Sequence, residues 1–77
     1  MRLIDIESSM IRAAGYDRKK HVLKIIFNNG HVYHYDDVPL SEYEGLMKAK
    51  SKGKYMQENI IDVYDYYQVE DEKPWDA

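Results

Sequence analysis

A tripeptide near the middle of the chain, Asn28-Asn29-Gly30, restricts the fold more than any other feature of the sequence. Asn and Gly tolerate the positive φ angles that tight turns require, so this tripeptide is a strong hairpin signal. Residues 21–27 before it are apolar and β-branched, and we expect them to pair with residues 31–36 after it. The sequence therefore predicts two antiparallel strands joined by a tight turn.

The length of the hairpin loop decides which side chains share a face of the sheet, because a one-residue shift in register turns a strand over. A two-residue turn would pair Ile26 with Tyr33. A three-residue loop, with Gly30 in the left-handed region as a bulge, pairs Ile25 with Tyr33 instead. We favour the three-residue loop because it gathers large apolar side chains on one face, namely Leu23, Ile25, Phe27, Tyr33 and Tyr35. The opposite face then carries Val22, Lys24, Ile26, Val32, His34 and Asp36.

A further strand is predicted before the hairpin, at residues 10–17, where a partly alternating segment precedes a polar turn. With the helices considered next, the sequence predicts an α+β fold: a three-stranded antiparallel β-meander followed by two short helices packed on one face of the sheet. The chain has 77 residues, which is enough for one domain, expected over residues 1–69. Residues 70–77 are acidic and lack periodicity, so we expect a disordered tail.

Two helices are predicted after the hairpin. Ser41 and Glu44 fit a capping box, in which each side chain satisfies a backbone N–H of the first turn, so we expect a helix over residues 41–50. A second helix is expected to start at residues 51–54, with an inner face formed by Met56, Ile60, Val63 and Tyr64. Residues 64–69 fit either the end of this helix or an extended segment.

Composition excludes several classes of function. The sequence has no Cys, so it has no disulfide framework and no zinc-thiolate cluster, and a cytoplasmic location is expected. The run Ile25-Ile26-Phe27 in the expected core is far shorter than the ~20 apolar residues that a membrane crossing needs. Net charge is +3 over residues 1–54 and −6 over residues 55–77, so a mildly basic body precedes an acidic end.

Three short motifs point to a known family. They are Gly15-Tyr16-Asp17, Tyr33-His34-Tyr35 and Ser51-x-Gly53-x-Tyr55. With the intervening pattern of apolar residues, they make residues 8–69 closely resemble the KTSC domain, which is named after the C-terminal extension of some lysyl-tRNA synthetases and also occurs in stand-alone bacterial and phage proteins. Tyr33, Tyr35 and Ser51 belong to the most specific part of this resemblance. Through the fusion to synthetases, the resemblance implies a role in RNA binding.

Basic loops are the candidate nucleic-acid contacts. They consist of Arg18, Lys19 and Lys20 in the first turn and Lys48, Lys50, Lys52 and Lys54 between the helices. Such lysines could hold phosphates, with Gly53 letting backbone amides approach an anion. Polar loops and helix ends also carry lysines for solvation alone, and only their convergence in three dimensions distinguishes the two interpretations. The sequence provides no whole-domain basic excess that would decide the matter.

The eight tyrosines allow both packing and base stacking. Tyr33 and Tyr35 fall on the expected core face, so we favour packing for them. Tyr16 and Tyr55 adjoin the basic loops and are the better candidates for contact with a ligand. The leading hypothesis is therefore a non-catalytic binding module for RNA or single-stranded DNA. The alternative is a protein–protein interaction adaptor of bacterial or phage origin, with no nucleic-acid role.

No catalytic residue, metal ligand or cofactor is assigned, and no membrane partner is expected. His31 and His34 are an odd number of positions apart on one strand, so they point to opposite faces of the sheet. Ser8 and Ser9 have no His nearby in the sequence to act as a base. Gly53-Lys54 is followed by Tyr55, where a phosphate-binding loop would have Ser or Thr. The chain is therefore not expected to be an enzyme.

Overall fold

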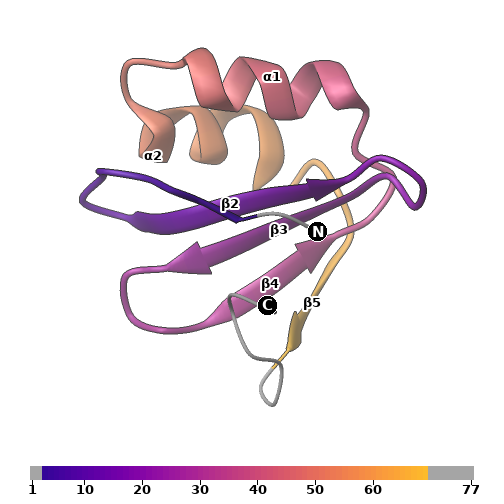
Figure 1. Ribbon diagram of the computed structural model, residues 1–77, viewed down its shortest axis with the longest axis horizontal. Coiled ribbons are helices and arrows are strands. Elements are labelled where there is room, and N and C mark those ends of the chain that lie inside the picture. The colour runs from indigo at the N-terminus through magenta and orange to yellow at the C-terminus, as the bar shows by residue number, and fades with distance from the viewer. Residues whose placement is uncertain (1–2, 70–77) are drawn as a thin grey trace.

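The predicted hairpin lies at the centre of a five-stranded antiparallel sheet in a computed structural model, which describes residues 3–69 (Figure 1). The strands are β1 (Leu3–Asp5), β2 (Ile11–Asp17), β3 (Val22–Phe27), β4 (Val32–Tyr35) and β5 (Tyr66–Val69), and they lie in the sheet in chain order. Between β4 and β5 come α1 (Leu40–Lys48), α2 (Lys52–Tyr55) and a π-helical turn, η1 (Met56–Ile60). The acidic segment at residues 70–77, with the prediction made for it, lies outside the described residues.

The register of the hairpin confirms the three-residue loop. Ile25 pairs with Tyr33, and Leu23 pairs with Tyr35. The backbone N–H of Phe27 donates to the carbonyl of His31 at 2.9 Å, and the N–H of Gly30 donates to the carbonyl of Phe27 at 2.9 Å. Gly30 has φ +92°, which places it in the region that favours glycine. The turn at residues 28–30 therefore sets the register, and the register decides which face of the sheet forms the core.

The α+β class is confirmed, but the sheet has five strands and the prediction of a three-stranded meander is wrong. The two additional strands occupy the edges, where β1 pairs with β2 and β5 pairs with β4. β1 has three residues, too few for a periodic pattern to stand out in the sequence. β5 falls in residues 64–69, where the sequence left helix and strand open, and its pairing with β4 selects the extended form.

Both helices cover the face of the sheet that the hairpin register made apolar (Figure 1). Leu23, Ile25 and Tyr35 from the sheet are buried together with Val38 from the connection before α1 and with three residues of the helical layer, Leu46, Met56 and Ile60. In β2, a bulge between Ile11 and Ala13 changes the alternation, so that Ile11 joins this core. None of the helices among residues 3–69 has the length and apolar character that a bilayer crossing requires.

The start of α1 differs from the capping-box prediction. The helix begins at Leu40, with Pro39 as the N-cap residue and no side-chain hydrogen bond to the first turn. Ser41 and Glu44 are exposed. The extended φ and ψ of Pro39 place the boundary two residues earlier than the box requires, so Ser41 already lies inside the helix and cannot cap it. The predicted end at residue 50 is also two residues too late.

The second helical segment begins where it was expected. Ser51 is the N-cap residue of α2, and its Oγ accepts the N–H of Lys54 at 3.3 Å. Met56 and Ile60 are buried as predicted, but Val63 is 60% exposed. The helical turn ends at Ile60, and Asp62 has φ +67°, so the chain has already left the helix before it reaches Val63.

The opposite face of the sheet was expected to be open, and at its centre it is buried. Ala13, Ile26 and Val32 form a second cluster there, and Leu3 and Val69 from the two edge strands pack against it. Lys24 lies on the same face and is only 1% exposed. β1 and β5, which were not predicted from the sequence, therefore bury part of this face.

Candidate nucleic-acid interface

The turn between β2 and β3 carries the first basic cluster, Arg18, Lys19 and Lys20, and all three side chains are exposed. The carboxylate of Asp17 closes this turn, because its Oδ1 accepts the N–H groups of Lys19 at 2.9 Å and Lys20 at 3.1 Å. The bond from Lys20 is the main cause that holds the pKa of Asp17 below its usual value. The backbone N–H groups of Lys19 and Lys20 thus already bind the Asp17 carboxylate, so only the side chains of this turn are available to phosphates.

The connection from α1 to α2 carries the second basic cluster, which we call the lysine end: Lys48, Lys50, Lys52 and Lys54. Lys48, Lys50 and Lys54 are exposed, whereas Lys52 is partly buried and its Nζ donates to the carbonyl of Ala49 at 2.9 Å. That bond satisfies a carbonyl just beyond the C-terminus of α1, where a cation is also favoured by the helix dipole. Lys52 is therefore partly a structural residue, and the other three are the exposed cations of this end.

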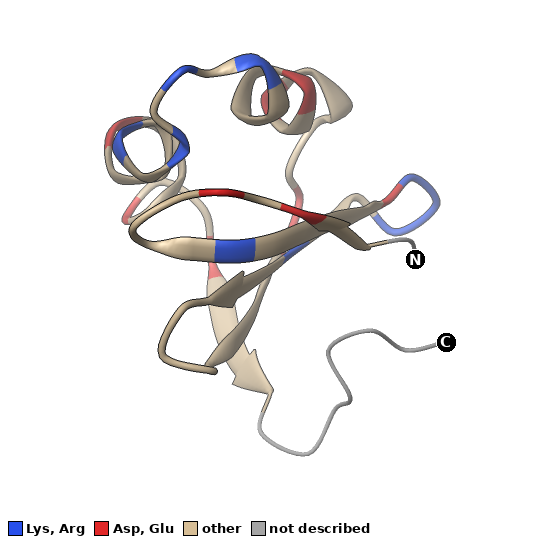
Figure 2. Cartoon of the chain, turned by 60° about the vertical axis from the view of Figure 1, so that its left-hand side comes forward, with Lys and Arg blue, Asp and Glu red and all other residues tan. Residues whose placement is uncertain are grey.

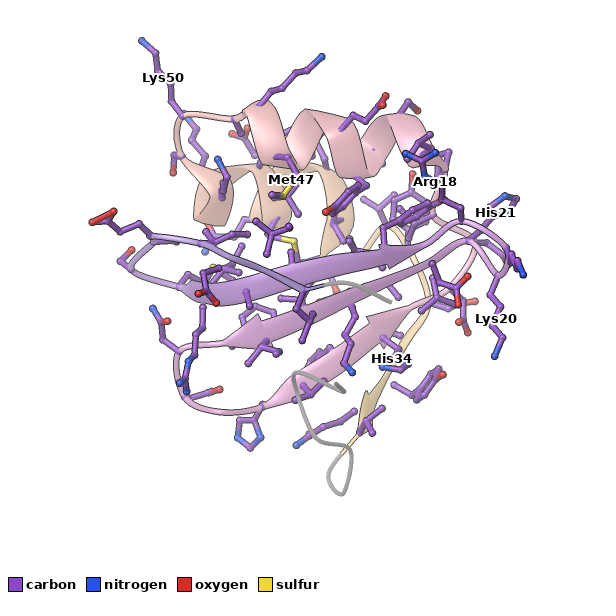
Figure 3. All side chains as sticks on the ribbon, in the orientation of Figure 1. Arg18, Lys20, His21, His34, Met47 and Lys50 are labelled. Atoms are coloured by element: carbon purple, nitrogen blue, oxygen red, sulfur yellow. The ribbon has the colours of Figure 1, made fainter. Side chains whose placement is uncertain are left out.

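The two basic clusters do not converge. Lys50 lies at one end of the helical layer, while Arg18 and Lys20 lie at the other end, beside the start of α1 (Figure 3). Figure 2 gives the same separation in a view turned from Figure 1, with the blue turn between β2 and β3 far from the blue segments around α2. The convergence required for one contiguous basic patch is therefore absent from the described residues, and each cluster must be judged by itself.

Gly53 has a packing role at the contact between α2 and the loop before β2. A Cβ atom built on Gly53 would stand 3.3 Å from Cβ of Met10 and 3.8 Å from Oγ of Ser8. α2 therefore contacts the segment before β2 at this glycine. Met10 thus occupies the space that the missing side chain leaves, and the approach of an anion to the backbone at Gly53 stays a prediction.

Tyr16, which was expected at the surface, is buried. Its hydroxyl donates to the carbonyl of Val38 at 2.5 Å, and its ring stacks on Tyr43 with centroids 5.3 Å apart. Burial raises the pKa of the Tyr16 hydroxyl. We therefore leave Tyr16 out of the contact surface.

Tyr55 is also held by neighbouring groups. Its hydroxyl donates to Oε1 of Glu42 at 2.5 Å, and the hydroxyl of Tyr64 donates to Oε2 of the same carboxylate at 3.0 Å. The Glu42 side chain in α1 thus ties α2 and the segment after η1 to the first helix. Each named residue of the Ser51-x-Gly53-x-Tyr55 motif therefore has a structural role. Ser51 caps α2, Gly53 packs against Met10, and Tyr55 bonds to Glu42.

The central tyrosine pair divides between core and surface. Tyr35 is 2% exposed and packs in the core, as the sequence indicated. Tyr33 is partly buried and lines a pocket of about 210 Å³ together with residues from β3, β5 and the hairpin loop. We call it the aromatic pocket, and its lining residues are Phe27, Asn29, His31, Tyr33, Tyr35, Ile61 and Tyr66.

Tyr66 is the member of this pocket that sequence reasoning missed. It lies in β5 opposite Tyr35, so it reaches the pocket only because β5 adds to the sheet. Tyr66 and Gln68 share one face of β5 and pair with Tyr35 and Tyr33, so a strand assignment there would have placed Tyr66 on the same face as Tyr33. The sequence alone fitted residues 64–69 equally to the end of a helix and to a strand, so this position of Tyr66 was not predicted.

The aromatic pocket and the lysine end are connected by the loop before β2. Asn28 beside the pocket donates from its Nδ2 to the carbonyl of Ser8 at 2.8 Å and from its N–H to the carbonyl of Met10 at 2.9 Å. A groove of about 490 Å³ continues from this loop, lined by Ser9, Met10, Ser51, Gly53, Lys54, Gln57 and Glu58. The loop thus lies between the hairpin turn beside the pocket and the groove that the exposed Lys54 lines.

The two histidines of the third predicted strand have different partners. His31 Nδ1 lies 2.7 Å from Nε2 of Gln68, and His34 Nδ1 lies 3.2 Å from the hydroxyl of Tyr67. Gln68 and Tyr67 are consecutive in β5 and therefore lie on opposite faces of the sheet. This arrangement agrees with the expectation that His31 and His34 do not act on a common ligand.

Comparison with known proteins identifies the family. The chain is 36% identical over 67 residues to a lysine–tRNA ligase from Nostoc, covering 87% of this chain and 12% of the ligase, and 31% identical over 58 residues to an uncharacterized protein from Stutzerimonas stutzeri, covering 75% and 82% of the two chains. The crystal structure of a KTSC domain protein from Yersinia pestis superposes with a TM-score of 0.85 at 28% identity, covering 90% of this chain and 97% of that one. The profile of the KTSC domain matches residues 7–66. The chain belongs to the KTSC domain family.

Proposed function

We propose that the protein is a non-catalytic binding module for RNA or single-stranded DNA, and that the lysine end forms its contact surface. The observation that carries this proposal is the link between the aromatic pocket and the groove lined by the exposed Lys54, through the loop at Ser8 to Met10. Proteins that bind single strands combine these two elements, a basic surface for the backbone and aromatic side chains for the bases.

Local charge matters more than net charge at this surface. The chain has a net charge of −3, which by itself disfavours nucleic acid. The Debye length is about 8 Å at physiological ionic strength, so charges farther away than this are largely screened. A strand at the lysine end would therefore respond mainly to Lys48, Lys50 and Lys54 and to the nearby Glu58.

The relatives support the same class of ligand. A lysine–tRNA ligase acts on tRNA, and the matching region makes up 12% of the Nostoc enzyme. A small domain appended to such an enzyme is well placed to add contacts to RNA. In the present chain the same type of domain would bind RNA or single-stranded DNA in the cytoplasm, independently of a ligase.

We propose no catalytic role for the hydroxyl groups of Ser8 and Tyr55. The Oγ of Ser8 accepts the N–H of Met10 at 3.1 Å and the N–H of Ile11 at 3.3 Å, which is the geometry of a turn. The hydroxyl of Tyr55 donates to the carboxylate of Glu42 and holds two helices together. Both groups have structural tasks that account for their positions.

A protein-interaction adaptor is the second candidate. It is favoured by three exposed apolar or aromatic side chains on and beside the edge strand β5, namely Val63 at 60%, Tyr66 at 52% and Tyr67 at 49% exposure. An edge strand presents unpaired backbone groups to which a partner strand can add. The experiment below separates this candidate from nucleic-acid binding.

The test compares two charge-matched variants. Lys50→Ala/Lys54→Ala removes two exposed cations from the lysine end, and Lys19→Ala/Lys20→Ala removes two exposed cations from the opposite end. Affinity for a short fluorescent RNA and its DNA counterpart is measured by anisotropy at several salt concentrations. We expect the first variant to bind more weakly and to lower the salt slope by about 1 to 2, while the second stays close to the wild type.

Other outcomes have definite meanings. An equal loss in both variants would indicate nonspecific attraction and contradict the site. A larger loss in Lys19→Ala/Lys20→Ala would move the site to the turn between β2 and β3. The absence of salt-dependent binding in the wild type would contradict nucleic-acid binding altogether and favour the adaptor.

A further inference from the structure

We propose that the aromatic pocket takes a single unpaired nucleobase from the strand bound at the lysine end. This inference rests on the proposed function and adds to it the chemistry of a second contact. In this proposal the base stacks on the paired rings of Tyr33 and Tyr66, which line the pocket.

The pocket has aromatic walls of defined geometry. The rings of Tyr33 and Tyr66 are parallel, with centroids 5.1 Å apart and an interplanar angle of 4°. Phe27 meets Tyr33 edge-on at 5.2 Å and 78°, and the buried Tyr35 lies 5.5 Å from Tyr66. These contacts fix the Tyr33 ring from several sides, whereas Tyr66 remains 52% exposed. A planar ligand can therefore extend an existing stack without any rearrangement of the core.

The lining has no carboxylate, ammonium or guanidinium group, and part of it is polar. Its seven residues include no Lys, Arg, Asp or Glu. Asn29 uses its Oδ1 to accept the N–H of His31 at 3.0 Å, and its amide nitrogen has no hydrogen-bond partner among residues 3–69. A neutral ring with hydrogen-bonding atoms on its edge suits such a lining, whereas a phosphate or an ammonium group would be desolvated there without a counter-charge.

The size of the pocket limits what enters it. A volume of about 210 Å³ is below the ~300 to 1,000 Å³ typical of pockets that enclose a drug-sized ligand. One base fits this volume, and the sugar and phosphates would remain outside. The loop at Ser8 to Met10 then leads the backbone toward Lys54, because it contacts Asn28 on one side and Gly53 on the other.

The strand β5 offers a matched pair of variants. Tyr66 and Tyr67 are neighbours with almost equal exposure, 52% and 49%, but they lie on opposite faces of the sheet. Tyr66→Ala removes a wall of the pocket, and Tyr67→Ala removes a similar ring from the other face. Any general effect of losing an exposed tyrosine from this edge strand is therefore common to both variants.

The experiment compares two probes: an oligoadenylate of about ten nucleotides and an abasic ribose-phosphate strand of the same length. We expect the wild type to bind the oligoadenylate about 5- to 100-fold more tightly than the abasic strand, as base–aromatic stacking predicts. Tyr66→Ala should lose this preference and Tyr67→Ala should keep it. Amide NMR spectra establish that each variant is folded, and Tyr66→Leu replaces Tyr66→Ala if the alanine variant is unfolded.

The outcomes separate this inference from the proposed function. If both probes bind equally and Lys50→Ala/Lys54→Ala still weakens binding, the base pocket is wrong and nucleic-acid binding stands. If neither probe binds, both proposals are wrong. In that case, shifts of the Phe27 and Tyr33 signals on addition of N-acetyl-tryptophanamide would reassign the pocket to an aromatic side chain of a protein partner.

Discussion

The ring of Tyr55 lies across Gly45, in the space that a side chain at position 45 would occupy. The ring's Cζ atom is 2.9 Å from the position of a Cβ atom built on Gly45. Gly45 is in the middle of α1, where glycine normally weakens a helix. The close contact between α1 and α2 explains why the helix contains it.

Gly45→Ala should therefore destabilise the domain, although alanine is the better helix former. The intrinsic gain in helix propensity is about 1 kcal/mol, and the displacement of a packed ring costs about 1 to 3 kcal/mol. We expect a net loss in the free energy of unfolding, measured by urea denaturation. In a Tyr55→Ala background the ring is absent, so the same substitution should be stabilising. A stabilising effect in the wild-type background would contradict the contact.

Alkaline pH should weaken the link between Glu42 and Tyr55. The hydrogen bond to Glu42, with burial as the second cause, raises the pKa of Tyr55 to about 12. The value for an unfolded chain is about 10. A group whose pKa is raised by folding contributes its stability below the unfolded pKa and loses it as the pH rises through the folded one. The free energy of unfolding should thus decline between pH about 10 and about 12.

Tyr55→Phe isolates this contribution. The variant should lose about 1 kcal/mol at neutral pH, because it removes one hydrogen bond. It should also show a shallower decline at alkaline pH than the wild type. Some decline will remain, since burial raises the pKa of Tyr35 to about 12 as well. Equal alkaline slopes in the two proteins would show that the bond to Glu42 does not set the pKa of Tyr55.

The centre of the fold could be predicted from the sequence because its determinants are local. The turn at Gly30 and the apolar alternation on both sides of it specify one register, and Leu23 pairs with Tyr35 accordingly. The capping box failed for an equally local reason, since Pro39 takes the N-cap position before Ser41. The edge strand β5 depends on pairing with β4 across two helical segments, and sequence periodicity does not report such pairing.

The site could be predicted only in parts. Each basic cluster is contiguous in sequence, but α1 separates Arg18 from Lys50, and this separation follows from how the helix lies on the sheet (Figure 3). Tyr16 adjoins a basic turn in sequence and yet points into the core. The aromatic pocket combines Phe27, Tyr33 and Tyr66 from three strands, so its existence depends on the completed sheet.

The hairpin turn gives a prediction about backbone conformation alone. Apart from the adjoining residues of the turn, no atom of residues 3–69 lies within 4 Å of a Cβ built on Gly30, so a side chain there meets no steric obstacle. Its φ of +92° is nevertheless unfavourable for other residues. Gly30→Ala should therefore lower the free energy of unfolding by about 1 to 2 kcal/mol, and Gly30→Asn should cost less because Asn tolerates positive φ. Equal losses in the two variants would contradict this explanation.

Tyr16 allows stability and binding to be separated. Tyr16→Phe removes the buried hydrogen bond to the carbonyl of Val38 and leaves the ring on Tyr43. The loss should be about 1 to 3 kcal/mol, because a buried acceptor remains unsatisfied. The affinity of the folded variant for RNA should match that of the wild type, since this hydroxyl lies inside the protein. Denaturation and anisotropy on the same sample check both statements, and a loss of affinity in a fully folded variant would return Tyr16 to the contact surface.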